Sequence, residues 1–146
     1  MSYTYEYPRP ALTVDAVVFR KNRSTWEVLL IKRANEPFKG MWAFPGGFVD
    51  MDEELEVAAG RELAEETGLR NVELGQLYAF GAIGRDPRHR TVSVVYWGIA
   101  DVHDSEVLGG DDAEQARWFP VGVAPGLAFD HHEILKFSVA KLANFI

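Results

Sequence analysis

Short, valine-rich segments that alternate with only two helical segments place the strongest constraint on the fold of this chain. Strand-like segments of this kind occur at residues 12–19, 26–32, 72–83, 91–100 and 116–121. The first two flank a polar turn and predict a β-hairpin. Residues 54–67 and 131–145 have helical composition and spacing. Because strands come before, between and after the helices, we predict an α+β fold in which helices cover a mixed sheet.

The ends of the two helices can be placed from local signals. Gly68 follows the first helix as a stop signal. Asp130 precedes the second and is expected to be its N-cap, with Glu133 at the capping-box position. The inward-facing side of this second helix is expected to consist of Ile134, Leu135, Leu142 and Phe145.

Composition excludes several classes of protein. A length of 146 residues predicts a single domain spanning 1–146. The chain has no cysteine, which excludes disulfides and thiolate metal sites. Its 15 basic and 22 acidic residues give a charge of −7, which argues against general binding to nucleic-acid backbones. Without a secretory signal or a long apolar run, we expect a cytoplasmic protein with no nucleic-acid or membrane partner.

Three acidic residues of the first helix form the main candidate site. Glu62, Glu65 and Glu66 lie at positions i, i+3 and i+4, within about 100° of one another on one helix face. The apolar stripe of this helix overlaps the same angles, so the carboxylates border the buried face. The negative charges also persist into the last turn of the helix, where the helix dipole disfavours them. A solvated acidic face is the alternative, but bound magnesium would explain both features.

A glycine pair precedes this helix within residues 45–48. Gly46 and Gly47 permit positive φ and a close approach of the backbone to a ligand or ion. A backbone carbonyl at this place could complete a metal site. Taken alone, the pair is equally typical of an ordinary bend between a strand and a loop.

Together, the glycine pair and the acidic helix resemble the Nudix box. The positions that match are Gly47, Glu53, Arg61, Glu62, Leu63, Glu65, Glu66, Gly68 and Leu69. On this motif the chain resembles Nudix hydrolases over essentially its whole length. The resemblance implies an α/β/α sandwich with a loop–helix–loop box. It also implies Mg²⁺- or Mn²⁺-dependent cleavage of a nucleoside diphosphate linked to another moiety.

The resemblance also implies roles for individual residues. The metal ligands would be Glu62, Glu65, Glu66 and the carbonyl of Gly46, and Gly47 would lie against the substrate. Arg61 and Glu53 would orient the carboxylates through an ion pair. The general base would be a box glutamate or an acid on a distant loop. The loop candidates are Asp111, Asp112 and Glu114, of which Asp112 is preferred; an ordinary polar loop is the alternative reading.

A positively charged loop after the box indicates which substrate the protein binds. The loop 84–90 carries Arg85, Arg88 and Arg90 together with His89, and arginine binds phosphate in a bidentate manner. Arg33, at the end of a predicted strand, is a further candidate for phosphate binding. With a proline, Pro87, at this distance after the box, the sequence resembles the ADP-ribose pyrophosphatase branch of the family. It equally resembles the Nudix domain of regulators of NAD metabolism that carry a winged helix, which we do not expect here because the sequence ends at Ile146.

ADP-ribose, cleaved to AMP and ribose 5-phosphate, is therefore the expected substrate. One alternative is a sensor that binds ADP-ribose without turnover and acts through a partner. Another is a pyrophosphohydrolase of nucleoside triphosphates or dinucleotide polyphosphates. A homodimer is expected from the resemblance alone.

Among other polar and aromatic residues, His131 and His132 are interpreted as part of a helix start, and Trp42, Phe44 and Phe48 as core.

Overall fold

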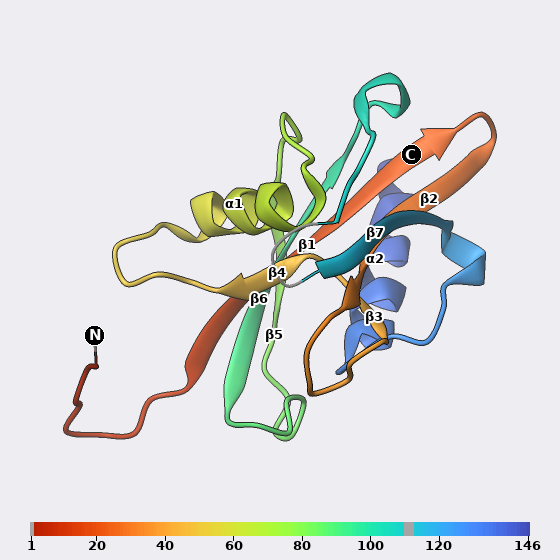
Figure 1. Ribbon diagram of the computed structural model, residues 1–146. Coiled ribbons are helices and arrows are strands. Elements are labelled where there is room, and N and C mark those ends of the chain that lie inside the picture. The colour runs from red at the N-terminus through yellow and green to blue at the C-terminus, as the bar shows by residue number, and fades with distance from the viewer. Residues whose placement is uncertain (1, 110–112) are drawn as a thin grey trace.

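The computed structural model describes residues 2–109 and 113–146 of the protein (Figure 1). The strands are β1 (Ala11–Asn22), β2 (Thr25–Arg33), β3 (Trp42–Ala43), β4 (Gly46–Phe48), β5 (Gly75–Phe80), β6 (Thr91–Ile99) and β7 (Ala113–Pro120). The helices are α1 (Leu55–Thr67) and α2 (His131–Phe145), with short 3-10 turns η1 (Val102–Asp104) and η2 (Val121–Val123). In this part of the chain, no helix has both the length and the apolar character needed to cross a membrane.

The strands form one mixed sheet in the order β3-β2-β1-β6-β5, with β4 paired to β1 and β7 paired to β2. The central pair, β1 and β6, is parallel from Ala11↔Thr91 to Phe19↔Ile99. The predicted hairpin is present as the antiparallel pair β1–β2. The parallel pair puts the N-terminal ends of β1 and β6 side by side, next to β4.

The two helices cover opposite faces of the sheet, as Figure 1 shows. Alternate residues of β1 divide between them: Val14, Ala16 and Val18 pack on the α1 side. Val17 and Phe19 pack on the α2 side. All of these side chains are buried, and burial of each large one stabilises the fold by about 1.5–3 kcal/mol. The α+β sandwich expected from the sequence is thus confirmed.

Three details of the secondary structure differ from the sequence-based expectation. The strand expected at 72–83 is only Gly75–Phe80, and positive φ angles at Asn71 and Gly84 lie on either side of it. Phe145 is 66% exposed rather than part of the inward face of α2: it lies in the final turn, where its ring makes a T-shaped contact with that of Trp97. Asp130 occupies the N-cap position but its side chain makes no capping hydrogen bond.

Candidate active site

The acidic face of α1 is graded from buried to exposed. Glu66 is 5% exposed and counts among the buried residues of the helix. The side chain of Glu62 is 14% exposed and that of Glu65 is 41% exposed. The helix ends at Gly68, which adopts a left-handed conformation with φ 75°. The carboxylates therefore border the core, as their overlap with the apolar stripe indicated.

Gly46 and Gly47 lie in extended backbone, so the positive φ that glycine permits is not used at this pair. They are needed for close approach instead. A Cβ on Gly47 would lie 2.6 Å from Oε1 of Glu62. A Cβ on Gly46 would collide with the Val14 carbonyl and the Asp15 carboxylate. Because β4 pairs with β1, the backbone of β4 lies in close contact with both β1 and the Glu62 carboxylate of α1.

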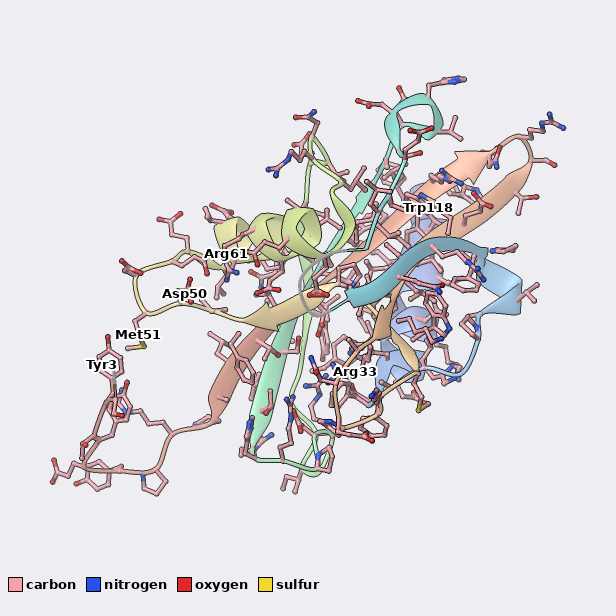
Figure 2. All side chains as sticks on the ribbon, viewed as in Figure 1. Tyr3, Arg33, Asp50, Met51, Arg61 and Trp118 are labelled. Atoms are coloured by element: carbon pink, nitrogen blue, oxygen red, sulfur yellow. The ribbon has the colours of Figure 1, made fainter. Side chains whose placement is uncertain are left out.

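Arg61 links the loop before α1 to the acidic face. Its Nε and Nη2 donate to Glu53 at 2.6 and 2.9 Å, which is the expected ion pair. Its Nη1 donates to Glu62 at 2.9 Å and to Glu65 at 3.2 Å. The hydrogen bond from Arg61 holds the pKa of Glu53 at about 2. Figure 2 shows Arg61 beside the loop that carries Asp50, whose carboxylate lies 3.8 Å from Nη2.

Glu66 is a buried acid with too little positive charge around it. Its Oε1 accepts a hydrogen bond from the Gly46 N–H at 3.2 Å. Burial, together with the negative charges of Glu62 and Asp15, raises the pKa of Glu66 to about 9. Burial also raises the pKa of Glu62.

This charge imbalance fits a divalent cation, because hard oxygen ligands of this kind suit magnesium and a cation would offset the repulsion. In residues 2–109 and 113–146, no three acidic or histidine side chains are already grouped to hold an ion. The reason is visible in the contacts, since Glu62 and Glu65 are drawn to Arg61. Of the predicted ligands, Glu62 and Glu66 lie together and Glu65 lies further out.

A cleft of about 380 Å³ opens beside these carboxylates. The residues that line it include Gly46, Gly47, Glu62 and Glu66 of the box and the arginines Arg33, Arg85 and Arg88. The sequence-predicted arginines and box residues therefore meet at one cavity, although they come from separate segments of the chain. In Figure 2, Arg33 lies below β4, toward the loops at one end of the sheet.

Two of the cleft arginines already have carboxylate partners. Arg85 is bidentate to Asp130, with Nε and Nη2 at 2.9 and 2.7 Å, and only 5% of its side chain is exposed. Arg88 is bidentate to Asp86 at 3.0 and 2.8 Å but remains 38% exposed. Burial opposes ionisation of Asp86, yet the hydrogen bonds from Arg88 hold its pKa at about 2. Arg88 is thus more accessible to a ligand than Arg85, which ties its loop to α2.

Aromatic rings line the same cleft. Phe129 has φ 53°, a left-handed conformation that is strained for a bulky residue and is found most often at functional sites. The guanidinium groups of Arg33 and Arg88 lie 5.0 and 5.6 Å from its ring. Phe48 is 45% exposed beside Arg88, so its interpretation as a core residue is wrong; Phe44 is buried as expected.

Sequence reasoning missed a buried polar group on the floor of the cleft. Asp15, Ser93 and His131 are 8%, 0% and 4% exposed. Asp15 could have been noticed as the one charged residue within the apolar segment 12–19. His131 was interpreted only as part of a helix start, but its ring lies 5.1 Å from that of Phe44 and it lines the cavity.

Two of the three loop candidates for a general base fall outside the part of the chain that the structure describes. Asp111 and Asp112 lie outside the described residues. Glu114 lies within β7, which pairs with β2.

The N-terminal residues 5–12 run beside the segment between β4 and α1, and the Tyr5 hydroxyl lies 4.0 Å from the sulfur of Met51.

Comparison with known proteins agrees with this geometry. The family model for the NUDIX domain matches residues 9–138. The chain is 44% identical over 130 residues to an ADP-ribose pyrophosphatase of Methanocaldococcus jannaschii, covering 89% of this chain and 73% of that protein. It is 37% identical over 145 residues to the ADPR responsive transcriptional repressor NtrR of Acinetobacter baylyi, covering 95% of this chain but 57% of the repressor.

A solved structure gives the same result in three dimensions. The NUDIX domain of Shewanella oneidensis NrtR, crystallised in complex with ADP ribose, superposes with a TM-score of 0.86 at 33% identity. The match covers 93% of this chain and 90% of that one. With a family model over most of its length and relatives of this similarity, the chain belongs to the Nudix family.

Proposed function

We propose that this protein hydrolyses ADP-ribose to AMP and ribose 5-phosphate with the help of a divalent cation, for which Mg²⁺ is the first candidate and Mn²⁺ the second. The observation that carries the proposal is the meeting of buried carboxylates and arginines at one cleft. Acidic side chains alone would repel a pyrophosphate, and arginines alone would bind it without a means of cleavage. The similarity to an ADP-ribose pyrophosphatase supports this choice of substrate.

The residues of the chain divide the work by charge. Glu62, Glu65 and Glu66 would hold the cation, with the Gly46 carbonyl as a further ligand. When bound, such a cation neutralises phosphate oxygens and makes water more acidic. Arg61 orients Glu62 and Glu65, and Glu53 fixes Arg61 in turn. The base that receives the proton of the attacking water would be a box glutamate or Asp112.

Arg88 and Arg33 are the proposed contacts to the phosphates of the substrate. Both line the cleft, and the exposed fraction of Arg88 leaves donors for a ligand. We expect Arg88→Ala to raise KM for ADP-ribose about tenfold, the loss of roughly one charge-assisted hydrogen bond. Steady-state kinetics would measure this, with Arg90→Ala on the same loop as the matched control. Unchanged KM in the Arg88 variant would place the phosphates elsewhere.

A non-catalytic sensor of ADP-ribose is the second candidate, favoured by the similarity to a repressor along 95% of this chain. A panel of ADP-ribose, nucleoside triphosphates and dinucleotide polyphosphates, each with Mg²⁺ and with Mn²⁺, separates the possibilities. AMP and ribose 5-phosphate as products support the proposal. Release of inorganic pyrophosphate from triphosphates would favour the third possibility, and binding of ADP-ribose without turnover would favour the sensor.

Three expectations from the sequence stay predictions. A homodimer is expected, and sedimentation equilibrium of the purified protein would test it. A cytoplasmic location is expected and can be tested by cell fractionation. Binding to nucleic acid is not expected from the charge of −7, and a retardation assay with DNA would test that expectation.

A further inference from the structure

Three elements bring together a buried polar group on the floor of the cleft. Asp15 comes from β1, Ser93 from β6 and His131 from the first turn of α2. The Ser93 hydroxyl donates a short hydrogen bond to Oδ2 of Asp15. This bond occupies one oxygen of the carboxylate and leaves Oδ1 directed toward Nε2 of His131.

The hydrogen bonds of His131 determine which ring nitrogen carries the proton. The backbone N–H of Phe44 donates to Nδ1 at 3.1 Å, so Nδ1 carries a lone pair. Burial lowers the pKa of His131, which keeps the ring neutral. A neutral imidazole then has its proton on Nε2. The side chain therefore presents an N–H donor toward Asp15.

This donor has no acceptor among the residues that the structure describes. Nε2 lies 3.9 Å from Oδ1 of Asp15, which is too long for a hydrogen bond. In the described part of the chain, every fully buried side-chain nitrogen or oxygen has a hydrogen-bond partner. Because Nε2 has none there, it must be open to the cleft that both residues line.

The spacing of the two atoms selects the kind of group that fits. An oxygen about 2.8 Å from each would subtend an angle of about 90°, which suits a hydroxyl that donates to Oδ1 and accepts from Nε2–H. A phosphate oxygen cannot donate and would be repelled by Asp15. An ammonium group cannot accept the proton of Nε2. A hydroxyl satisfies both partners at once.

We infer that Asp15 and His131 bind one sugar hydroxyl of the substrate and so determine specificity. The inference rests on the proposed function, because a nucleotide sugar supplies such hydroxyls. The site lies close to the metal-binding carboxylates, since Gly46 pairs with Asp15 in the sheet and donates its N–H to Glu66. Both riboses of ADP-ribose are one phosphate away from the bond that breaks, so the experiment must distinguish them.

The test combines substrate analogues with two substitutions of His131. His131→Asn puts an amide oxygen near the place of Nδ1, so it keeps an acceptor for the Phe44 N–H but loses the Nε2 donor. His131→Gln puts an amide nitrogen near the place of Nε2 and is the matched control. The substrates are ADP-ribose and analogues that each lack one hydroxyl, either on the adenosine ribose or on the terminal ribose.

For one analogue, we expect the wild-type kcat/KM to fall roughly 10- to 100-fold, the loss of a hydrogen bond to a charged group. In His131→Asn, ADP-ribose should lose a similar factor, and removal of that same hydroxyl should then have almost no effect. His131→Gln should retain part of the discrimination. The analogue that shows this non-additive behaviour identifies the ribose that is bound.

Additive losses for every analogue would overturn the inference and give His131 a structural role only. Thermal unfolding shows whether His131→Asn folds; if it does not, the same comparison with Asp15→Asn decides, because Ser93 can still donate to the amide oxygen. Absence of ADP-ribose hydrolysis by the wild type would overturn the proposed function together with this inference. Hydrolysis with additive losses would overturn this inference alone.

Discussion

Replacement of Glu66 by glutamine should make the metal-free protein more stable and the enzyme less active. Glutamine keeps an amide oxygen as acceptor for the Gly46 N–H, which lies 3.2 Å from Oε1 in the wild type. It removes a carboxyl group that is 5% exposed and close to two other acids. The ability of the side chain to ionise, and not its shape, is what changes.

The pKa of Glu66 gives the size of the effect. Burial raises this pKa from 4.5 to about 9. At pH 7 the folded protein keeps the proton while the unfolded chain has released it, so ionisation stabilises only the unfolded chain. At about 1.4 kcal/mol per pH unit above 4.5, the destabilisation at pH 7 reaches up to about 3 kcal/mol. Below pH 4.5 both states are protonated and the difference disappears.

Chemical denaturation of the metal-free protein between pH 4.5 and 9 would measure this effect. The free energy of unfolding of the wild type should fall relative to Glu66→Gln as the pH rises through this window. With saturating Mg²⁺ at pH 7, the variant should turn over ADP-ribose more slowly by orders of magnitude. A general loss of folding cannot produce higher stability with lower activity. Equal or lower stability of the variant at pH 7, or wild-type turnover, would refute the reasoning.

Three further outcomes are expected. Gly47→Ala should displace Glu62, because the new Cβ would lie 2.6 Å from Oε1. Isothermal titration should then show weaker Mg²⁺ binding without loss of fold. Gly60→Ala is the control, because its Cβ meets nothing within 4 Å and Mg²⁺ binding should stay unchanged. Arg85→Ala should lower the free energy of unfolding by about 3 kcal/mol, since it leaves the Asp130 carboxylate without its bidentate partner; a change only in KM would contradict this. Chelation of divalent cations should abolish hydrolysis. The affinity for Mg²⁺ should rise with pH up to about 9, because the cation must displace the proton of Glu66. An affinity independent of pH would argue against Glu66 as a ligand.

Much of the box could be predicted from the sequence because its geometry is local. The spacing of Glu62, Glu65 and Glu66 on a helix puts them near one face, and Arg61 reaches Glu53 only eight residues away. The valine-rich segments likewise indicated the strands and the two-layered cover of helices. Local periodicity is a property of neighbouring residues, so it can be evaluated without knowledge of the rest of the chain.

The order of burial along that face was not available from spacing. Glu66 is buried and Glu65 is exposed because β4 passes over one side of α1, and the course of β4 is set by its pairing with β1. From the sequence, the glycines of β4 could serve either positive φ or close approach, and the structure requires them for close approach. A residue type can thus be recognised as special from sequence while its physical reason depends on what packs against it.

The amino-acid sequence by itself determined the helix face and, through the periodicity of its segments, the class of fold, because periodicity depends on residues close together in the chain. The resemblance to the Nudix box added the Arg61–Glu53 pair. Only the tertiary structure decided that Arg85 is held by Asp130, 45 residues away, and that Ser93 donates to Asp15 across 78 residues. The parallel register of β1 and β6 creates the second contact. Such contacts leave no periodic signal, since a buried polar residue acquires its partner only when distant strands meet.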